Sequence, residues 1–203
     1  MWTENPIFRE DLDRLTSYDY IPWDDLRDST VFITGATGLI GYTAVCALLR
    51  YDQLHDAGIK VVALVRDVGR AEAKFSRQIA DGCDITFIRG SVEYLPEIVG
   101  KIDYIIHGAC PTSSQYFVDH AVETIDTIVN GTKNVLDLAR KKNVSGVVFL
   151  SSMEVSEPPP SADRSQKATW VISTCPPRAA ATPRESASRR TCAAPTQASI
   201  AYL

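Results

Sequence analysis

The sequence predicts an α/β protein built on a doubly wound parallel sheet. An apolar run that begins at Val31 leads into three glycines, Gly35, Gly38 and Gly41, and an amphipathic stretch follows at once. Further short apolar runs alternate with helical patterns through the first 150 residues. This alternation is typical of parallel strands joined by right-handed helical crossovers. We therefore expect a Rossmann-type sheet, incomplete on its C-terminal side because residues 165–203 show no helical or strand period.

The individual elements are predicted from the same patterns. Near-continuous apolar stretches are typical of strands buried on both faces. After the run at Val31, they lie at residues 60–65, 84–88, 102–107 and 146–150. Helical periodicity places the connecting helices at residues 39–50, 70–80 and 121–142. Because ligands of such sheets bind beyond the carboxyl ends of the strands, site residues are expected there.

The glycine segment is the most informative site motif. Its G-x-x-G-x-x-G spacing lies between a strand and a helix, which is the context that a dinucleotide-binding turn requires. The glycines let the backbone turn sharply and approach a pyrophosphate, and the helix start offers free N–H groups. An ordinary glycine-rich turn is the alternative. We expect NAD or NADP to contact the following residues of this segment: Gly35, Thr37, Gly38, Leu39, Ile40 and Gly41.

The ends of the next strands supply further candidates for cofactor binding. Arg66 and Asp67 follow the second strand. An acid there would bind the adenosine ribose hydroxyls, whereas an arginine would favour the extra phosphate of NADP, so the choice stays open although NAD is preferred. Ser91 and Val92 follow the third strand, where adenine would rest.

Small residues follow the fourth strand, and hydroxyls follow the fifth. Gly108, Ala109 and Cys110 would let the ribose and nicotinamide lie against the backbone. His107, which precedes them, is either a base or, as we expect, a structural residue, since no neighbouring acid would orient it. The fifth strand leads into Ser151, Ser152 and Glu154. Ser151 and Ser152 could simply cap the strand end, but the upstream glycines favour a role in substrate or cofactor binding.

Composition limits the class of protein. The chain has 203 residues and a formal net charge of −4, which gives no reason to expect a nucleic-acid partner. It shows no signal peptide and no apolar run long enough for a membrane span. The five cysteines form no C-x-x-C pair, and Cys46 and Cys83 are expected to be buried thiols, so the predicted setting is reducing and cytoplasmic. No metal site is expected.

Three segments are predicted along the chain. Residues 1–28 form an N-terminal extension that should pack along the domain as a helix and an extended piece, or contact another subunit. Residues 29–160 form the NAD(P)-binding domain. Residues 161–203 form an irregular tail. Within the tail, residues 165–203 contain five basic residues but a single acid, Glu185, a composition typical of poor core formers.

The motifs together identify a family resemblance. Residues 34–41, 107–109, 130–132 and 151–155 resemble those of extended short-chain dehydrogenases/reductases, in the NAD-dependent epimerase/dehydratase family of sugar-nucleotide enzymes. UDP-glucuronate decarboxylases are most similar, followed by dTDP-glucose 4,6-dehydratases and UDP-sugar 4-epimerases.

The resemblance implies a reaction and its residues. A bound NAD transiently oxidises C4 of a nucleotide sugar, with Ser152 and Glu154 as catalytic residues and Asn130 beside the cofactor. Met153 replaces an aspartate of the dehydratases, which argues against a simple 4,6-dehydratase. The resemblance also allows a homodimer.

The chain departs from the family pattern after Glu154. The family expects Val-Tyr-Gly there, but the chain has Val155-Ser156-Glu157, and no tyrosine is followed by lysine four residues later. We expect residues 165–203 to be an out-of-frame translation, because a shifted reading permits a Tyr-x-x-x-Lys sequence between Ala181 and Ala187. A genuine short paralogue is the alternative. The expected protein is either an impaired enzyme or a non-catalytic dinucleotide-binding fragment or regulatory subunit.

Overall fold

The computed structural model describes residues 5–151 and contains a five-stranded parallel sheet. The strands are β1 (Thr30–Thr34), β2 (Lys60–Val65), β3 (Ile85–Arg89), β4 (Tyr104–His107) and β5 (Gly146–Phe149). Their order in the sheet is β3-β2-β1-β4-β5, and every neighbouring pair is parallel. The predicted fold class is therefore confirmed for this part of the chain. The order reverses between β1 and β4, which is the point where open α/β sheets bind their ligands.

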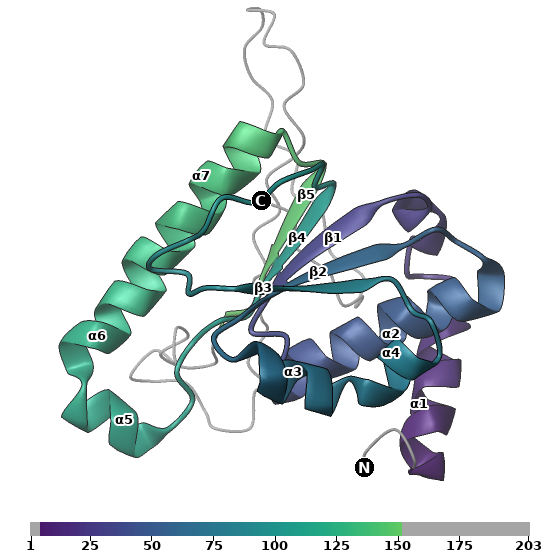
Figure 1. Ribbon diagram of the computed structural model, residues 1–203, viewed down its shortest axis with the longest axis horizontal. Coiled ribbons are helices and arrows are strands. Elements are labelled where there is room, and N and C mark those ends of the chain that lie inside the picture. Colours follow the sequence, from purple (N-terminus) through teal and green to yellow (C-terminus); the bar gives the residue numbers. More distant parts are fainter. Residues whose placement is uncertain (1–4, 152–203) are drawn as a thin grey trace, which may run out of the picture.

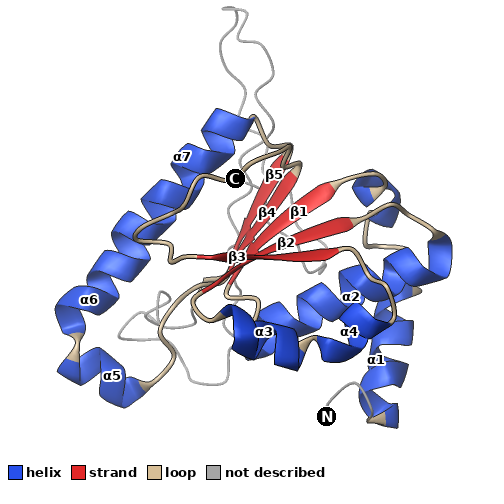
Figure 2. Ribbon diagram, viewed as in Figure 1, coloured by secondary structure: helices blue, strands red, loops and turns tan. Residues whose placement is uncertain are grey.

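Helices cover both faces of the sheet, as Figures 1 and 2 show. One face carries α2 (Leu39–His55), α3 (Val68–Lys74) and α4 (Ser76–Ala80), with α1 (Pro6–Thr16) outside α2. The other face carries α6 (Ala121–Asp126), a π-helical turn η3 (Thr127–Gly131) and α7 (Thr132–Lys142), preceded by α5 (Ser114–Asp119). A short 3₁₀ helix, η2 (Trp23–Leu26), leads into β1.

The alternation of side chains along β1 divides the core into two layers. Val31 and Ile33 pack into the cluster that includes α2, whereas Phe32 packs into the cluster that includes Val135 of α7. All three strand residues are almost completely buried. The continuous apolar run of β1 is thus explained by burial on both faces.

Helix boundaries differ from the predicted ones in three places. The helix predicted at 39–50 continues to His55, because Tyr51 is buried and its ring stacks on Trp23, 4.5 Å between centroids. The helix predicted at 70–80 is divided at Phe75, whose backbone leaves the helical region (φ −101°, ψ 16°). The helix predicted at 121–142 contains the π turn η3.

The N-terminal extension packs on the domain as expected, through α1 and η2. Leu12 of α1 is buried in the cluster that contains α2, and Asp13 accepts a hydrogen bond from Arg50 Nε at 2.7 Å. Asn5 caps α1 by accepting from the Ile7 N–H. Residues 5–28 thus contact the domain of their own chain, and a contact with another subunit stays a prediction.

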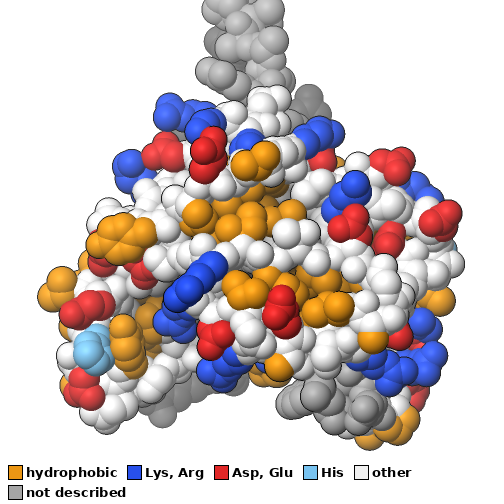
Figure 3. Space-filling model, viewed as in Figure 1, with side chains coloured by type: hydrophobic (Ala, Val, Ile, Leu, Met, Phe, Trp, Pro, Cys, Tyr) orange, Lys and Arg blue, Asp and Glu red, His pale blue; other side chains and the backbone are white. Residues whose placement is uncertain are grey.

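Several apolar side chains on α5, α6 and η3 are exposed. Val118, Val122 and Ile125 are 77%, 76% and 61% exposed. Figure 3 shows apolar side chains over α5 and α6, and a second group in the middle of the same face. The expected homodimer stays a prediction. Between residues 5 and 151, no helix combines the length and hydropathy that crossing a membrane requires.

Phe75 offers a test of the packing beneath α3 and α4. Its side chain is fully buried, and its ring lies 5.0 Å from that of Tyr42 and 5.7 Å from that of Phe87. Phe75→Ala should lower the free energy of unfolding by about 3–5 kcal/mol, because it removes these contacts and leaves a cavity. Ile79→Ala on α4, where the side chain is 44% exposed, is the matched control and should cost less than about 1.5 kcal/mol. Guanidinium denaturation followed by circular dichroism measures both, and equal losses would contradict this account.

Candidate dinucleotide site

The turn between β1 and α2 needs glycine at two positions for backbone reasons. Gly35 has φ +74°, and a Cβ there would lie 2.5 Å from the carbonyl oxygen of Gly108. At Gly41, a Cβ would collide with the carbonyl of Gly35. Both glycines thus let β1, the start of α2 and the end of β4 approach one another closely.

Gly38 has a different environment. Its φ of −72° is open to any residue, and a Cβ would meet only the Gly35 oxygen, at 3.2 Å. Gly38 is the N-cap of the 17-residue helix α2 and has no side chain to cap it. The first N–H groups of the helix are therefore offered to a ligand, and the missing Cβ leaves room for one.

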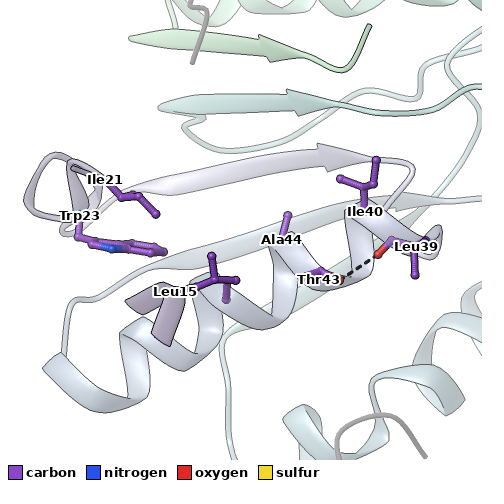
Figure 4. Close-up of a pocket in the computed structure, with 8 residues that line it drawn as sticks. Leu15, Ile21, Trp23, Leu39, Ile40, Thr43 and Ala44 are labelled. Carbon is purple, nitrogen blue, oxygen red and sulfur yellow. Dashed lines mark hydrogen bonds between the residues drawn. The ribbon is translucent and has the colours of Figure 1, made fainter. Parts of the chain in front are cut away.

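Leu39 and Ile40 present apolar side chains beside these N–H groups. They are 70% and 63% exposed and line a hollow of about 390 Å³ together with Leu15, Ile21 and Trp23 (Figure 4). The lining is apolar, so this hollow does not suit a phosphate. Leu39 and Ile40 can contribute to a pyrophosphate site through their backbone only.

Lys74 supports the turn from α3. Its Nζ donates to the carbonyl oxygen of Thr37 at 2.7 Å and lies 4.6 Å from the centre of the Tyr42 ring. The hydrogen bond fixes the middle of the glycine segment and brings a positive charge to the side of the predicted pyrophosphate site. Thr37 itself is half-buried.

A buried polar chain links β1, β4 and α7. Thr34 Oγ1 lies 2.6 Å from His107 Nδ1, and His107 Nε2 lies 3.1 Å from Thr132 Oγ1. The Ala109 N–H donates to Thr34 Oγ1 at 3.2 Å, so the threonine hydroxyl proton is available to Nδ1. This arrangement assigns the Nε2–H tautomer to His107. The imidazole is 3% exposed, and burial lowers its pKa to about 4, so it is neutral at pH 7. Its structural role stays a prediction, which these buried hydrogen bonds favour.

Arg66 and Asp67 lie at the carboxyl end of the sheet, directly after β2. With Val68, Gly69 and Arg89 they line a hollow of about 370 Å³. Asp67 is the N-cap of α3, and its Oδ1 accepts from the Arg70 N–H at 3.0 Å. Both predicted residues thus border one hollow, and Arg89 at the end of β3 joins them.

The loop after β3 is held by the long helix. Asn134 Nδ2 donates to the carbonyl oxygens of Val92 and Glu93, each at 3.0 Å. The Val92 side chain is buried against Gly131, where a Cβ would lie 2.6 Å from its Cγ2. Ser91 accepts a hydrogen bond from the Tyr94 N–H. Of the two predicted adenine neighbours, only Ser91 keeps a partly exposed side chain.

Two further groups lie on this side of the sheet. Burial raises the pKa of Glu93, but the Thr127 hydroxyl donates to it and nearby Arg66 attracts its charge, so the net pKa is lowered. Asn130, in the π turn, is exposed and donates to Asp126 Oδ1. The π turn that contains Asn130 contacts Val92 through Gly131.

The ends of β4 and β5 adjoin each other. The Leu150 N–H donates to the His107 carbonyl at 2.9 Å, and the Leu150 side chain packs on Gly108. Cys110 and Ser151 are exposed at these ends. Ser152 and Glu154, the predicted catalytic residues, lie outside the described residues. Among residues 5–151, no group of three His, Cys, Asp or Glu side chains could hold a metal ion.

Comparison with known proteins agrees with this geometry. Residues 31–179 match the model of the NAD dependent epimerase/dehydratase family. The chain belongs to this family. It is 31% identical over 134 residues to the NAD-dependent epimerase/dehydratase FUM13 of Gibberella moniliformis, an alignment that covers 61% of this chain and 35% of that protein. A UDP-glucose 4-epimerase of Rickettsia canadensis is 29% identical, with 62% and 37% covered.

Two more relatives extend the comparison. A dTDP-glucose 4,6-dehydratase of Streptomyces niveus is 27% identical, with 62% of this chain and 38% of that protein covered. The structure of a UDP-N-acetylglucosamine 4-epimerase from Methanobrevibacter ruminantium has a TM-score of 0.53 at 21% identity and supports the fold alone; 69% of this chain and 44% of that chain are covered. The chain thus spans little more than a third of the length of these curated relatives.

Sequence reasoning did not select several residues that shape this candidate site. Thr34 and Asn134 hold backbone from β4 and the β3 loop, Lys74 holds the glycine turn, and Arg89 faces the hollow at β2. Arg89 could have been selected from the sequence, because it ends the third strand and ligands bind beyond strand ends. The others act through contacts between residues 37 or more positions apart, which no local pattern reveals.

Gly38 and Gly41 should respond differently to substitution by alanine. Gly41→Ala should lower the free energy of unfolding by more than about 2 kcal/mol, since its Cβ meets backbone. Gly38→Ala should leave the unfolding free energy within about 1 kcal/mol but weaken dinucleotide binding about tenfold or more, because its Cβ enters the open side of the turn. Chemical denaturation and NADH titration measure the two effects. Unchanged NADH binding by Gly38→Ala would contradict the assignment of this turn to the dinucleotide site.

The pH dependence of stability should report the neutral His107. Because the folded-state pKa is depressed to about 4 from 6.5, the unfolded state binds the additional proton between these values. The stabilisation is complete above pH 6.5 and is lost as the pH falls through 4. Wild type should lose about 2 kcal/mol between pH 7 and pH 4 that His107→Gln does not lose. The exposed His120→Gln is the control and should behave as wild type in denaturation at each pH.

Proposed function

We propose that the chain binds NAD or NADP across the carboxyl end of its sheet. The observation that carries the proposal is the difference between the glycines of the turn. Gly35 and Gly41 are required because a Cβ there would collide with backbone atoms, whereas Gly38 leaves open space at the uncapped start of α2. The pyrophosphate would lie on the N–H groups of residues 38–41. The adenosine half would extend over the ends of β2 and β3, towards Arg66 and Ser91.

The nicotinamide half would lie over the ends of β4 and β5. Gly108 and Ala109 present backbone there, and exposed Cys110 and Ser151 border the same place. When bound, the nicotinamide accepts and returns a hydride. Under this proposal the Ser152 hydroxyl holds the oxygen on the sugar carbon that is oxidised, and the Glu154 carboxylate supplies the acid or base of the step that follows.

The proposed substrate is a nucleotide sugar oxidised transiently at C4. Support comes from membership of the epimerase/dehydratase family and from relatives named as UDP-glucose 4-epimerases and a dTDP-glucose 4,6-dehydratase. The choice between epimerase, dehydratase and decarboxylase rests on sugar-contacting residues that the motifs do not identify. The decarboxylase resemblance remains a prediction.

A second candidate function is dinucleotide binding without efficient catalysis. Its specific support is that none of the eight tyrosines is followed by lysine at the fourth position. In the family pattern, the tyrosine is the general base, and the lysine lowers its pKa and holds the nicotinamide ribose. An out-of-frame origin of residues 165–203 would account for the missing pair.

Restoring the reading frame tests catalysis. A chain with the alternative frame after Arg164 should turn over UDP-glucose, dTDP-glucose or UDP-glucuronate at least about 100- to 10,000-fold faster than the 203-residue chain, because a positioned acid–base pair is regained. Product formation is followed by chromatography. Ser152→Ala in the restored chain is the matched control and should abolish most of the gain. Equal turnover by both chains would contradict the proposed role of the missing pair.

A further inference from the structure

The N-terminal extension contacts the start of α2 through a pair of aromatic rings. Phe8 of α1 stacks on Tyr42 of α2, with 6.1 Å between the ring centroids and 17° between the ring planes. Tyr42 is 4% exposed, and its N–H donates to the carbonyl oxygen of Gly38 in the first turn of the helix, at 3.0 Å. Because the family match begins at residue 31, this contact joins a segment outside the matched region to the start of α2.

The Tyr42 ring also contacts a cation of α3. Lys74 Nζ lies 4.6 Å from the centre of this ring and donates to the carbonyl oxygen of Thr37 at 2.7 Å. No carboxylate of residues 5–151 forms a salt bridge with Lys74. An aromatic ring attracts an ammonium group through its quadrupole, and the attraction is stronger where water is excluded. The ring therefore holds the ammonium at the Thr37 carbonyl without neutralising its charge.

The position of Thr37 connects these contacts to the proposed pyrophosphate site. Thr37 directly precedes Gly38, the N-cap of α2, so the carbonyl that Lys74 holds belongs to the peptide unit between them. A peptide unit is planar, and fixing its oxygen therefore also fixes the direction in which the chain enters the helix. The ammonium adds a positive charge beside the start of α2, where the N–H groups already favour an anion.

On the basis of the proposed dinucleotide site, we propose that the N-terminal extension positions the glycine turn for the pyrophosphate through Phe8, Tyr42 and Lys74. Phe8 packs on the Tyr42 ring, the ring holds the Lys74 ammonium, and the ammonium holds the Thr37 carbonyl. Phe8 and Lys74 are positioning residues in this account, since neither needs to touch the cofactor. NADH and NADPH contain the same pyrophosphate, so the extension affects both affinities equally.

Titration of the 203-residue chain with NADH and NADPH tests the role of Lys74. Lys74→Met should weaken both dinucleotides about tenfold, because methionine keeps an unbranched side chain but lacks the charge and the donor. Lys74→Arg keeps both and should restore the affinities to within about threefold of wild type. Lys60→Met removes the same charge from an exposed position at the start of β2. It is the matched control and should leave both affinities near wild type.

The role of Phe8 is tested together with Lys74. Phe8→Ala should weaken both dinucleotides about threefold, whereas Ile7→Ala, at a position of α1 that is 66% exposed, should have no effect. Phe8→Leu removes the ring but keeps an apolar side chain, so it should give the same loss with less effect on folding. If the two residues act in series, Phe8→Ala combined with Lys74→Met should bind no more weakly than Lys74→Met alone.

The outcomes separate this inference from the proposed function. If Lys74→Met, or both Phe8 variants, bind the dinucleotides as tightly as wild type does, the inference is overturned but the dinucleotide site stands. Losses that multiply in the double variant also overturn it, because the two residues would then act independently. A Lys60→Met effect as large as that of Lys74→Met overturns it as well, since general attraction would explain the loss. If wild type binds neither dinucleotide, the proposed function fails, and the inference fails with it.

Discussion

The close approach of two backbones, at Gly35 and Gly108, is the constraint on which the site depends. A Cβ on Gly35 would lie 2.5 Å from the Gly108 carbonyl oxygen, so β1 and β4 can adjoin at this end only with glycine at position 35. The same turn leads into α2, which starts with no side-chain cap on its first N–H groups. The strand order reverses between β1 and β4, and ligands of open α/β sheets bind at such a point. The contact between the backbones of Gly35 and Gly108 therefore sets the position of the candidate site.

The polar chain of Thr34, His107 and Thr132 connects the elements that meet at this approach. Thr34 Oγ1 receives the Ala109 N–H and meets the imidazole, while the other ring nitrogen meets a hydroxyl of α7. A buried chain of polar groups is stable only if each group has a hydrogen-bond partner. In a protonated imidazole both ring nitrogens carry N–H, so Nδ1 could no longer accept from the Thr34 hydroxyl. Burial between these elements lowers the pKa of His107, so the residue joins β1, β4 and α7 as a neutral group.

The sequence was sufficient for the sheet and for the main turn because both depend on local patterns. The apolar runs of β1 and β2 and the spacing of Gly35, Gly38 and Gly41 are each contained in a dozen residues or fewer. The break at Phe75 was missed, since its cause is a ring buried between Tyr42 and Phe87. Asn134 was missed because its hydrogen bonds connect it to residues 41 and 42 positions away. Long-range side-chain contacts of this kind have no periodic signal.

In the proposed site, the groups that would hold the pyrophosphate and the adenosine lie on other strands than the proposed catalytic residues. The turn at β1 is held by Gly108, Thr34 and Lys74, and the proposed adenosine side lies at the ends of β2 and β3, all between residues 30 and 109. The family's acid–base residues follow β5, in a later part of the chain. A chain that keeps the glycine turn and the ends of β2 and β3 can retain the proposed dinucleotide site even where the residues after β5 are altered. Binding measurements and turnover measurements on this protein therefore report on different residues, and neither can substitute for the other.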